Sequence, residues 1–367
     1  MINLKLFPSS RLAFYMVRLF LTRTFAVMVA LGVVLMMLSL LGEAGKILAV
    51  PGNTNDDVWR FAGYRLPLLV SFLLPFSVLL GTLIAFVGLN QNSEVVAMKA
   101  AGLSAHQILA PLVLASMVLA AGLFAFNEGV TVNAARHLDA WQNNDYKPVP
   151  PSSGISSNVW LLNGDDLVRA GIVAGRGNGM KLQDVSIYDR TGGVLQRTIT
   201  APSATHDPTG RGWLLNKAQI YDATQNVVRQ VPELRTLEGV SPAQFTLAKV
   251  DPTELDYWTL KERVAQLEAA GRPTDEARAG LAHKLSSPLS TILMPLLAAV
   301  AAFGLARSGQ VMLRAVTGMA LGFAYFVADN FALAMGNAGA YPPLIAAWAP
   351  FVLFLLIGET VLIRTEE

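Results

Sequence analysis

The chain contains no cysteine, so it can form neither disulfide bonds nor thiolate metal sites. Charge is also scarce: 15% of its 367 residues are charged, against about 25% in ordinary soluble domains. The net charge of +2 gives no basic field of the kind that attracts nucleic acid. Hydrophobic residues make up 53% of the chain instead. This balance and the length predict a membrane region joined to one soluble domain.

Catalytic motifs are missing as well. The glycines of GEAGK, at residues 42–46, have the wrong spacing for a phosphate-binding loop. The four histidines are scattered without the HExxH spacing of a zinc site, and there is no GxSxG nucleophile elbow. The sequence therefore predicts a protein that is not an enzyme and that binds no cofactor or metal. Any energy that it uses is expected to come from another chain.

Long uncharged stretches organise the rest of the chain, and a helix needs about 20 apolar residues to cross a bilayer. Such stretches cover residues 24–42, 66–93, 107–127 and 285–306, and residues 315–358 carry a single charge, Asp329. The glycines and prolines of GNAGAYPP, at residues 336–343, divide the last stretch into two. Six transmembrane helices follow, three on each side of a polar segment. The two termini and the short loops on the side of the N-terminus together hold eight lysines and arginines, and the outer loop 43–65 holds three, which predicts that both termini are cytoplasmic.

The polar interruption NQNSEVVAMKAAGLSAHQ, at residues 90–107, predicts a short amphipathic cytoplasmic helix over residues 93–102. Ser93 is expected to cap its start, and Gly102 to end it in a left-handed conformation. Ser104 and Gln107 then have the spacing of a capping box that begins the next helix. Two interpretations stay open from the residues alone: a docking site for a partner, or a rigid turn between two spans.

The polar segment 128–284 holds 17 of the 28 basic and 18 of the 26 acidic residues. It contains six short strand-like runs: NVWLLNG, DLVRAGIVAG, KLQDVSIYD, GVLQRTITA, WLLNKAQIYD and NVVRQV. Glycine, aspartate and asparagine clusters separate them, which is typical of a β-sandwich or an open barrel. Residues 255–270 return to a helical pattern. We expect membrane helices over residues 1–127, the β domain over 128–255, a connecting helix and linker over 256–284, and further membrane helices over 285–367.

Three groups of residues are candidates for function. Asp329 and Glu359 are acids within predicted spans and could bind protons or ions; the alternative for Asp329 is a packing role, bonded to Asn330 or to water. Four cations near outer membrane boundaries could hold an anionic headgroup or simply reach the interface: Lys46, Arg60, Arg65 and Arg136. Gly318 and Gly322 form a GxxxG face that predicts close helix packing.

Several of these runs resemble the lipopolysaccharide export permeases of the LptF/LptG (YjgP/YjgQ) family. They are LPFSVLLGTLIAFVGLNQNSEVVAMKAAGLSAHQIL, NEGVTVNAAR, KLSSPLSTILMPLLA and RAVTGMALGFAYFVADNFALAMG. The last run resembles the LptG branch more than the LptF branch. Val132 departs from the pattern, because many members carry proline there.

The resemblance implies a half-transporter of an ABC-type exporter in the bacterial inner membrane, with six spans and a periplasmic antiparallel β-jellyroll between the third and the fourth. Its partners would be an LptF-like permease, an LptB-like ATPase dimer that binds the ATP, an LptC-like single-span protein and lipopolysaccharide. Glu94 would match the acid of a coupling helix, and the ATPase contacts would come from Glu94, Val95, Met98 and Lys99. The four outer cations would hold lipid phosphates.

Two other classes of function stay open. A scaffold or mechanical protein would let an ATPase move the outer domain without passing lipid, and a carrier built on Asp329 would be driven by protons. Bound lipopolysaccharide would favour export. ATPase coupling without lipid would favour the mechanical class, and a need for a pH gradient without ATP would favour the carrier.

Overall fold

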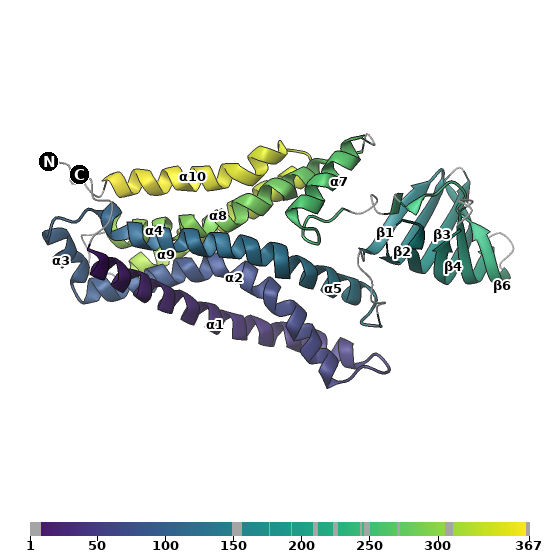
Figure 1. Ribbon diagram of the computed structural model, residues 1–367, viewed down its shortest axis with the longest axis horizontal. Coiled ribbons are helices and arrows are strands. Elements are labelled where there is room, and N and C mark those ends of the chain that lie inside the picture. The colour runs from purple at the N-terminus through teal and green to yellow at the C-terminus, as the bar shows by residue number, and fades with distance from the viewer. Residues whose placement is uncertain are drawn as a thin grey trace.

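The computed structural model describes residues 9–148, 156–175, 177–191, 193–207, 212–222, 227–242, 244–245, 250–269, 272–304 and 311–364. Long helices run side by side, and a β-sheet domain lies beyond one end of them (Figure 1). The main helices are α1 (Ser10–Leu48), α2 (Asn55–Gln91), α3 (Glu94–Ala100), α4 (Ala105–Phe126), α5 (Val132–Asn143), α7 (Tyr257–Ala269), α8 (Asp275–Gly304), α9 (Val311–Asn337) and α10 (Pro343–Arg364).

Five helices are long and apolar enough to cross a membrane: α1, α2, the C-terminal part of α9, α10, and a continuous helix from Ala105 to Asn143. They correspond to five of the six predicted spans. α8 contains the remaining uncharged stretch and packs against α2, α4, α9 and α10. Its length of 30 residues is sufficient to span, but the count of six stays a prediction.

One apolar core joins these helices, and it is built mainly from α2, α4 and α8. Phe86, Leu112 and Leu297 are almost completely buried in it. Because lipid tails are as apolar as leucine, close packing rather than removal from water holds membrane helices together. Small residues at the contacts therefore matter more here than in a soluble bundle.

Two glycines show how close these contacts are. A Cβ on Gly81 of α2 would lie 2.7 Å from the backbone nitrogen and Cα of Thr24 in α1. A Cβ on Gly322 of α9 would collide with the side chain of Leu79 in α2. Gly318, the other glycine of the predicted GxxxG pair, is buried. The predicted packing role of Gly322 thus has a defined neighbour on α2.

We expect Gly81→Ala to lower the thermal unfolding temperature of the detergent-purified protein clearly. The new methyl group would meet backbone atoms, which cannot move aside as a side chain can, and overpacking costs about 1–3 kcal/mol. Gly88→Ala is the matched control, because Gly88 lies on the same helix with nothing within 4 Å of its Cβ position. Equal melting temperatures for the two variants would contradict the close α1–α2 contact.

The third membrane helix does not end where its uncharged stretch ends. α4 continues through a π-helical turn, η1 (Asn127–Thr131), into α5. Polar side chains of this turn have partners on neighbouring helices: Ser71 lies 2.6 Å from Asn127 and 2.8 Å from Thr131. The side chain of Val132 is buried and its backbone is helical. The helix is therefore continuous at the position where Val132 replaces the expected proline. Residues 128–143, predicted to open the β domain, are therefore helical, and that boundary is wrong.

The β domain is a six-stranded antiparallel sheet between the third and fourth membrane segments, as predicted. Its strands pair strictly in sequence order: β1 (Ser156–Asn163), β2 (Asp166–Ala174), β3 (Lys181–Thr191), β4 (Val194–His206), β5 (Trp213–Asp222) and β6 (Val227–Thr236). All six predicted strands are present. The described strands form a meander, because each strand pairs directly with the one before it. The crossover connections of a Greek-key jellyroll are not present among these described strands.

A seam crosses this sheet at one position in every strand. Residues on both sides of the seam are paired with the adjacent strand, but the seam residues themselves are not. These are Asn158, Gly171, Asp184, Pro202, Lys217 and Pro232. The three on β1, β3 and β5 have left-handed backbone, with φ of 50°, 50° and 53°; each lies opposite glycine or proline.

The alternation of buried residues shifts by one at the seam. On β3, Val185 and Ile187 face the apolar core of the sheet on one side of it, and Leu182 faces the same core on the other. The break in the period of two thus keeps one apolar face continuous where the strands bend.

The chain returns to the membrane through α7, which packs on the first turns of α8. Asp256 caps its start and accepts hydrogen bonds from the Thr259 amide at 3.0 Å and hydroxyl at 2.7 Å. Burial opposes ionisation of this carboxyl, but hydrogen bonds from Thr259 and from nearby backbone amides together outweigh it and hold the pKa of Asp256 below its usual value. The predicted connecting helix corresponds to α7.

Candidate functional site

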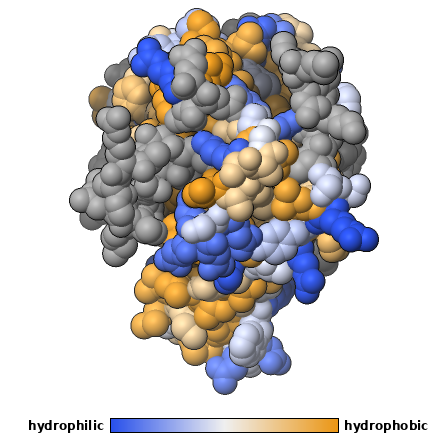
Figure 2. Space-filling view, turned by 90° about the vertical axis from the view of Figure 1, so that its left-hand side faces the viewer, coloured by the Kyte–Doolittle hydropathy of each residue, from blue (hydrophilic) through white to orange (hydrophobic). Residues whose placement is uncertain are grey.

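Helix α3 lies at the opposite end of the molecule from the β domain, together with the start of α1 and the end of α10 (Figure 1). Looking onto this end, Figure 2 shows hydrophilic residues across the middle and hydrophobic residues below them. Gly102 ends α3 with φ of 84°, as predicted. Ser104 and Gln107 form the predicted capping box, with bonds of 3.1 and 3.2 Å.

The start of α3 differs from the prediction. Ser93 has left-handed backbone, with φ of 60°, and its side chain makes no capping hydrogen bond. The Glu94 carboxylate instead accepts a hydrogen bond from the Tyr15 hydroxyl of α1 at 2.9 Å, and one from the Asn92 amide at 3.4 Å. A carboxylate in the first turn also favours the helix dipole. The acid at the head of α3 is therefore held by the first membrane helix.

The four residues predicted to contact an ATPase fall on two faces of α3. Val95 and Met98 are buried in the protein's own helical core, at 4% and 8% exposure. Their assignment to a docking surface is wrong, because they fasten α3 to α2 and α4. Glu94 and Lys99 lie on the outward side, where Val96 is 66% exposed. The outward side of α3 thus combines an acid, a base and one large apolar side chain.

At the other end of the helices, the predicted cations have different surroundings. Lys46 is exposed and pairs with Glu43 at 3.1 Å. Glu43 also accepts a hydrogen bond of 2.6 Å from the Tyr146 hydroxyl beyond α5. Burial and this bond raise the pKa of Tyr146 to about 12, so its hydroxyl remains a donor. The end of α1 is therefore tied to the segment that leads into the sheet.

Arg65 points into a groove of about 520 Å³ between α1 and α2. The walls are apolar except for one serine: Leu35, Leu38, Ser39, Leu68, Leu69 and Phe72. The Nε atom of Arg65 is buried, and no hydrogen-bond acceptor reaches it from the described part of the chain. A buried donor without an acceptor is costly. The groove is thus suited to an amphiphilic molecule with an anionic group beside an apolar tail.

The remaining two predicted cations contact the protein itself. The Arg60 guanidinium lies over the rings of Tyr64 and Trp141, at 5.8 and 5.6 Å from their centres. Arg136 donates from Nε and Nη2 to the Glu254 carbonyl, at 3.2 and 2.9 Å. Two donors of Arg136 are therefore used to hold α5 to the segment before α7.

Both intramembrane acids have a histidine partner. Asp329 lies 3.0 Å from His283 of α8, and Glu359 lies 3.3 Å from His106 of α4. Asn330, expected as a partner of Asp329, donates to the Phe326 carbonyl instead. A cavity of about 170 Å³ adjoins Asp329, and one carboxylate oxygen of Asp329 has no partner among the described residues. These pairs are compatible with helix packing.

Three contributors escaped the sequence reasoning because their partners are distant in the chain. Tyr15 lies 79 residues before Glu94. Glu128 accepts from Lys284, 156 residues later, at 3.3 Å, and also from the Tyr257 amide. Both side chains of the Glu128–Lys284 pair are mostly buried, at 18% and 13% exposure. The only feature of the sequence that pointed to Glu128 and Lys284 was their position at the edges of uncharged stretches.

No group of three or more histidine, aspartate or glutamate side chains in the described segments could hold a metal ion. The features described above are an anchored α3 at one end of the helices and an arginine-bearing apolar groove toward the other.

The chain is similar to known proteins over most of its length. A family model for the lipopolysaccharide export system permeases LptF/LptG matches residues 14–364. The chain is 27% identical over 303 residues to the lipopolysaccharide export system permease protein LptG of Escherichia coli strain K12, covering 80% of this chain and 82% of the relative. It is 25% identical over 332 residues to the LptG protein of Haemophilus influenzae strain Rd, covering 86% and 89%. The chain therefore belongs to the LptF/LptG family of lipopolysaccharide export permeases.

Proposed function

We propose that this permease subunit takes lipopolysaccharide from the outer leaflet of the inner membrane and passes it toward periplasmic β domains, driven by a separate cytoplasmic ATPase. A second, LptF-like permease would complete the transport cavity, and an LptC-like protein would receive the lipid. The single observation that carries the lipid-binding part is Arg65 in its leucine-walled groove. The relatives named LptG favour that branch over the LptF-type paralogue.

The orientation rests on two observations. Basic residues are concentrated in the termini and short loops on the side of the N-terminus, which favours a cytoplasmic location for that side. Helix α3 lies at this end and the sheet domain at the other (Figure 1). An ATPase at α3 would therefore act in the cytoplasm while the sheet domain stands in the periplasm.

The docking surface on α3 is proposed to consist of Glu94, Val96 and Lys99. Val96 replaces Val95 and Met98 as the apolar contact, because it is exposed whereas they are buried. The bond from Tyr15 connects this surface to α1, and α1 forms one wall of the Arg65 groove. A displacement of α3 would thereby be transmitted to the groove through α1.

The groove supplies both parts of an amphiphile's binding site. Leucine and phenylalanine side chains can pack along acyl chains, and the unsatisfied Arg65 donor can bond a phosphate oxygen. Lys46 and Arg60 lie near the same end of the helices with exposed side chains, where solvent weakens their contribution. Arg65 is therefore expected to dominate, with Lys46 adding to it.

We expect Arg65→Gln to weaken lipopolysaccharide binding about tenfold, the effect of losing one partly desolvated phosphate contact. Lys46→Gln alone should weaken binding less, and the double variant should weaken it more than either. Binding is measured by scintillation proximity with radiolabelled lipopolysaccharide on the detergent-purified protein. Thermal unfolding of the same samples separates lost binding from lost stability. Normal affinity of a stable Arg65→Gln variant would overturn the headgroup role.

The alternatives predict other results. A mechanical protein would stimulate its ATPase without retaining lipid. A proton-driven carrier would need Asp329, and Asp329→Asn would then abolish transport while ATP hydrolysis had no effect. Lipid release that depends on ATP and survives Asp329→Asn would exclude the carrier and favour export.

A further inference from the structure

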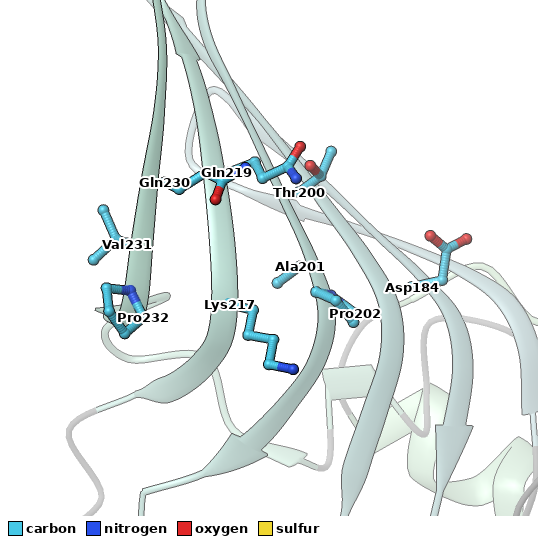
Figure 3. Close-up of a pocket in the computed structure, with 9 residues that line it drawn as sticks. All are labelled: Asp184, Thr200, Ala201, Pro202, Lys217, Gln219, Gln230, Val231 and Pro232. Atoms are coloured by element: carbon cyan, nitrogen blue, oxygen red, sulfur yellow. The ribbon is translucent and has the colours of Figure 1, made fainter.

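A further cavity lies on the sheet domain, far along the chain from the Arg65 groove. It has a volume of about 760 Å³ and lies where strands β3 to β6 cross the seam. Ligand pockets in proteins typically have volumes of about 300–1,000 Å³. Figure 3 shows its lining side chains, drawn from four adjacent strands.

Neutral hydrogen-bonding groups form one end of this pocket. Thr200, Gln219 and Gln230 stand directly opposite one another on β4, β5 and β6, so they share one face of the sheet. Figure 3 shows them gathered together. A hydroxyl and two carboxamides offer both donors and acceptors at fixed spacing. Such groups match the hydroxyls of a sugar, and they are poor partners for an acyl chain.

The charges of the pocket are unequal. Asp184 is neutralised by Arg169, which donates to it at 3.0 Å. Lys217 has no ion-pair partner within the described ranges. One uncompensated cation therefore remains beside the neutral groups, and a ligand with a carboxylate or phosphate would satisfy it.

The backbone at Lys217 is held in a conformation that few lysines adopt. Its φ of 53° is unfavourable for an L-residue with a long side chain. Residues held in sparsely populated conformations are concentrated at binding sites. Glycine or asparagine would adopt this backbone conformation at lower cost than lysine does.

We infer that this pocket binds an anionic oligosaccharide, with Lys217 on its acidic group and the Thr200–Gln219–Gln230 row on its hydroxyls. The apolar edges of Pro202 and Pro232 line the pocket and can pack on sugar ring faces. As to source, the sugar part of the transported lipid is the first candidate, and that identification rests on the proposed function. A free acidic glycan has the same chemistry, so the test distinguishes the two.

The test uses the full-length protein in detergent and isothermal titration calorimetry with tri-galacturonic acid, a carboxylated trisaccharide. Saturable binding is expected, and maltotriose, which is neutral, should bind at least tenfold more weakly. Lys217→Asn should weaken the acidic probe about tenfold, since it removes the charge and asparagine tolerates left-handed backbone. Lys181→Asn is the matched control: Lys181 is an exposed lysine on β3 outside the pocket.

A second variant and a second ligand complete the design. Gln219→Ala should also weaken binding, with an unchanged melting temperature. The delipidated oligosaccharide of lipopolysaccharide should displace tri-galacturonic acid if the lipid is the source, and a failure to displace it identifies a free glycan. Absence of saturable binding, or equal losses in Lys217→Asn and Lys181→Asn, would overturn the inference. Neither result would affect the Arg65 experiment, so the two proposals fail separately.

Discussion

Glu94→Lys should reduce ATP-driven release of lipopolysaccharide from proteoliposomes to background while the protein still inserts and folds. The reversed charge removes the acceptor for the Tyr15 hydroxyl and places a cation at the start of α3. It also inverts the charge of the surface proposed to meet the ATPase. Because both the bond to α1 and the contact with the ATPase are disrupted, we expect a larger loss of lipid release than from any single change in the lipid groove.

Tyr15→Phe separates the two contacts. It deletes the 2.9 Å hydrogen bond but leaves the Glu94 carboxylate available to a partner. Recruitment of the ATPase, measured by co-purification, should stay normal in Tyr15→Phe and fall in Glu94→Lys, whereas release should fall in both. Normal release by the lysine variant would contradict a coupling role for α3.

Glu128→Ala should destabilise the protein by about 3–5 kcal/mol, because it leaves the Lys284 ammonium mostly buried without its partner. The same change removes the acceptor of the Tyr257 amide at the start of α7. Three segments lose their common bond: the π-helical turn after α4, the start of α7, and α8. Thermal or denaturant unfolding in detergent measures the loss.

The double variant Glu128→Ala, Lys284→Met is the control for this prediction. Methionine leaves no charge to be stranded, so most of the lost stability should return, and the remainder reflects the unpaired amide. If the double variant is less stable than Glu128→Ala alone, the cost does not come from a stranded ammonium. In that case the pair would be an interfacial contact accessible to water.

Much of the fold follows from local pattern. Uncharged stretches identified the membrane segments, and alternation with turn clusters identified all six strands. The extension of the third helix to Asn143 was missed because Glu128 and Arg136 look like the start of a soluble domain. Their charges are satisfied by Lys284 and by the Glu254 carbonyl, and neither partner can be read from local sequence.

The seam of the sheet could have been predicted in part from the sequence. The apolar period of two breaks between Leu182 and Val185, and again between Leu215 and Ala218. A break at corresponding positions of several strands is the signal of a bend, but its alignment across the sheet requires the register. Sequence alone also could not decide which apolar face of α3 was free. Val95 and Val96 are adjacent and chemically identical, and only the packing of α2 and α4 buries the first.

The most direct test of lipopolysaccharide export is to purify the chain in mild detergent together with its co-purifying partners, and to quantify the bound lipid by mass spectrometry before and after ATP is added. Export predicts about one lipopolysaccharide per complex, lost when ATP is hydrolysed and reduced in Arg65→Gln. Bound phospholipid alone, or lipopolysaccharide that stays bound through ATP hydrolysis, would contradict it.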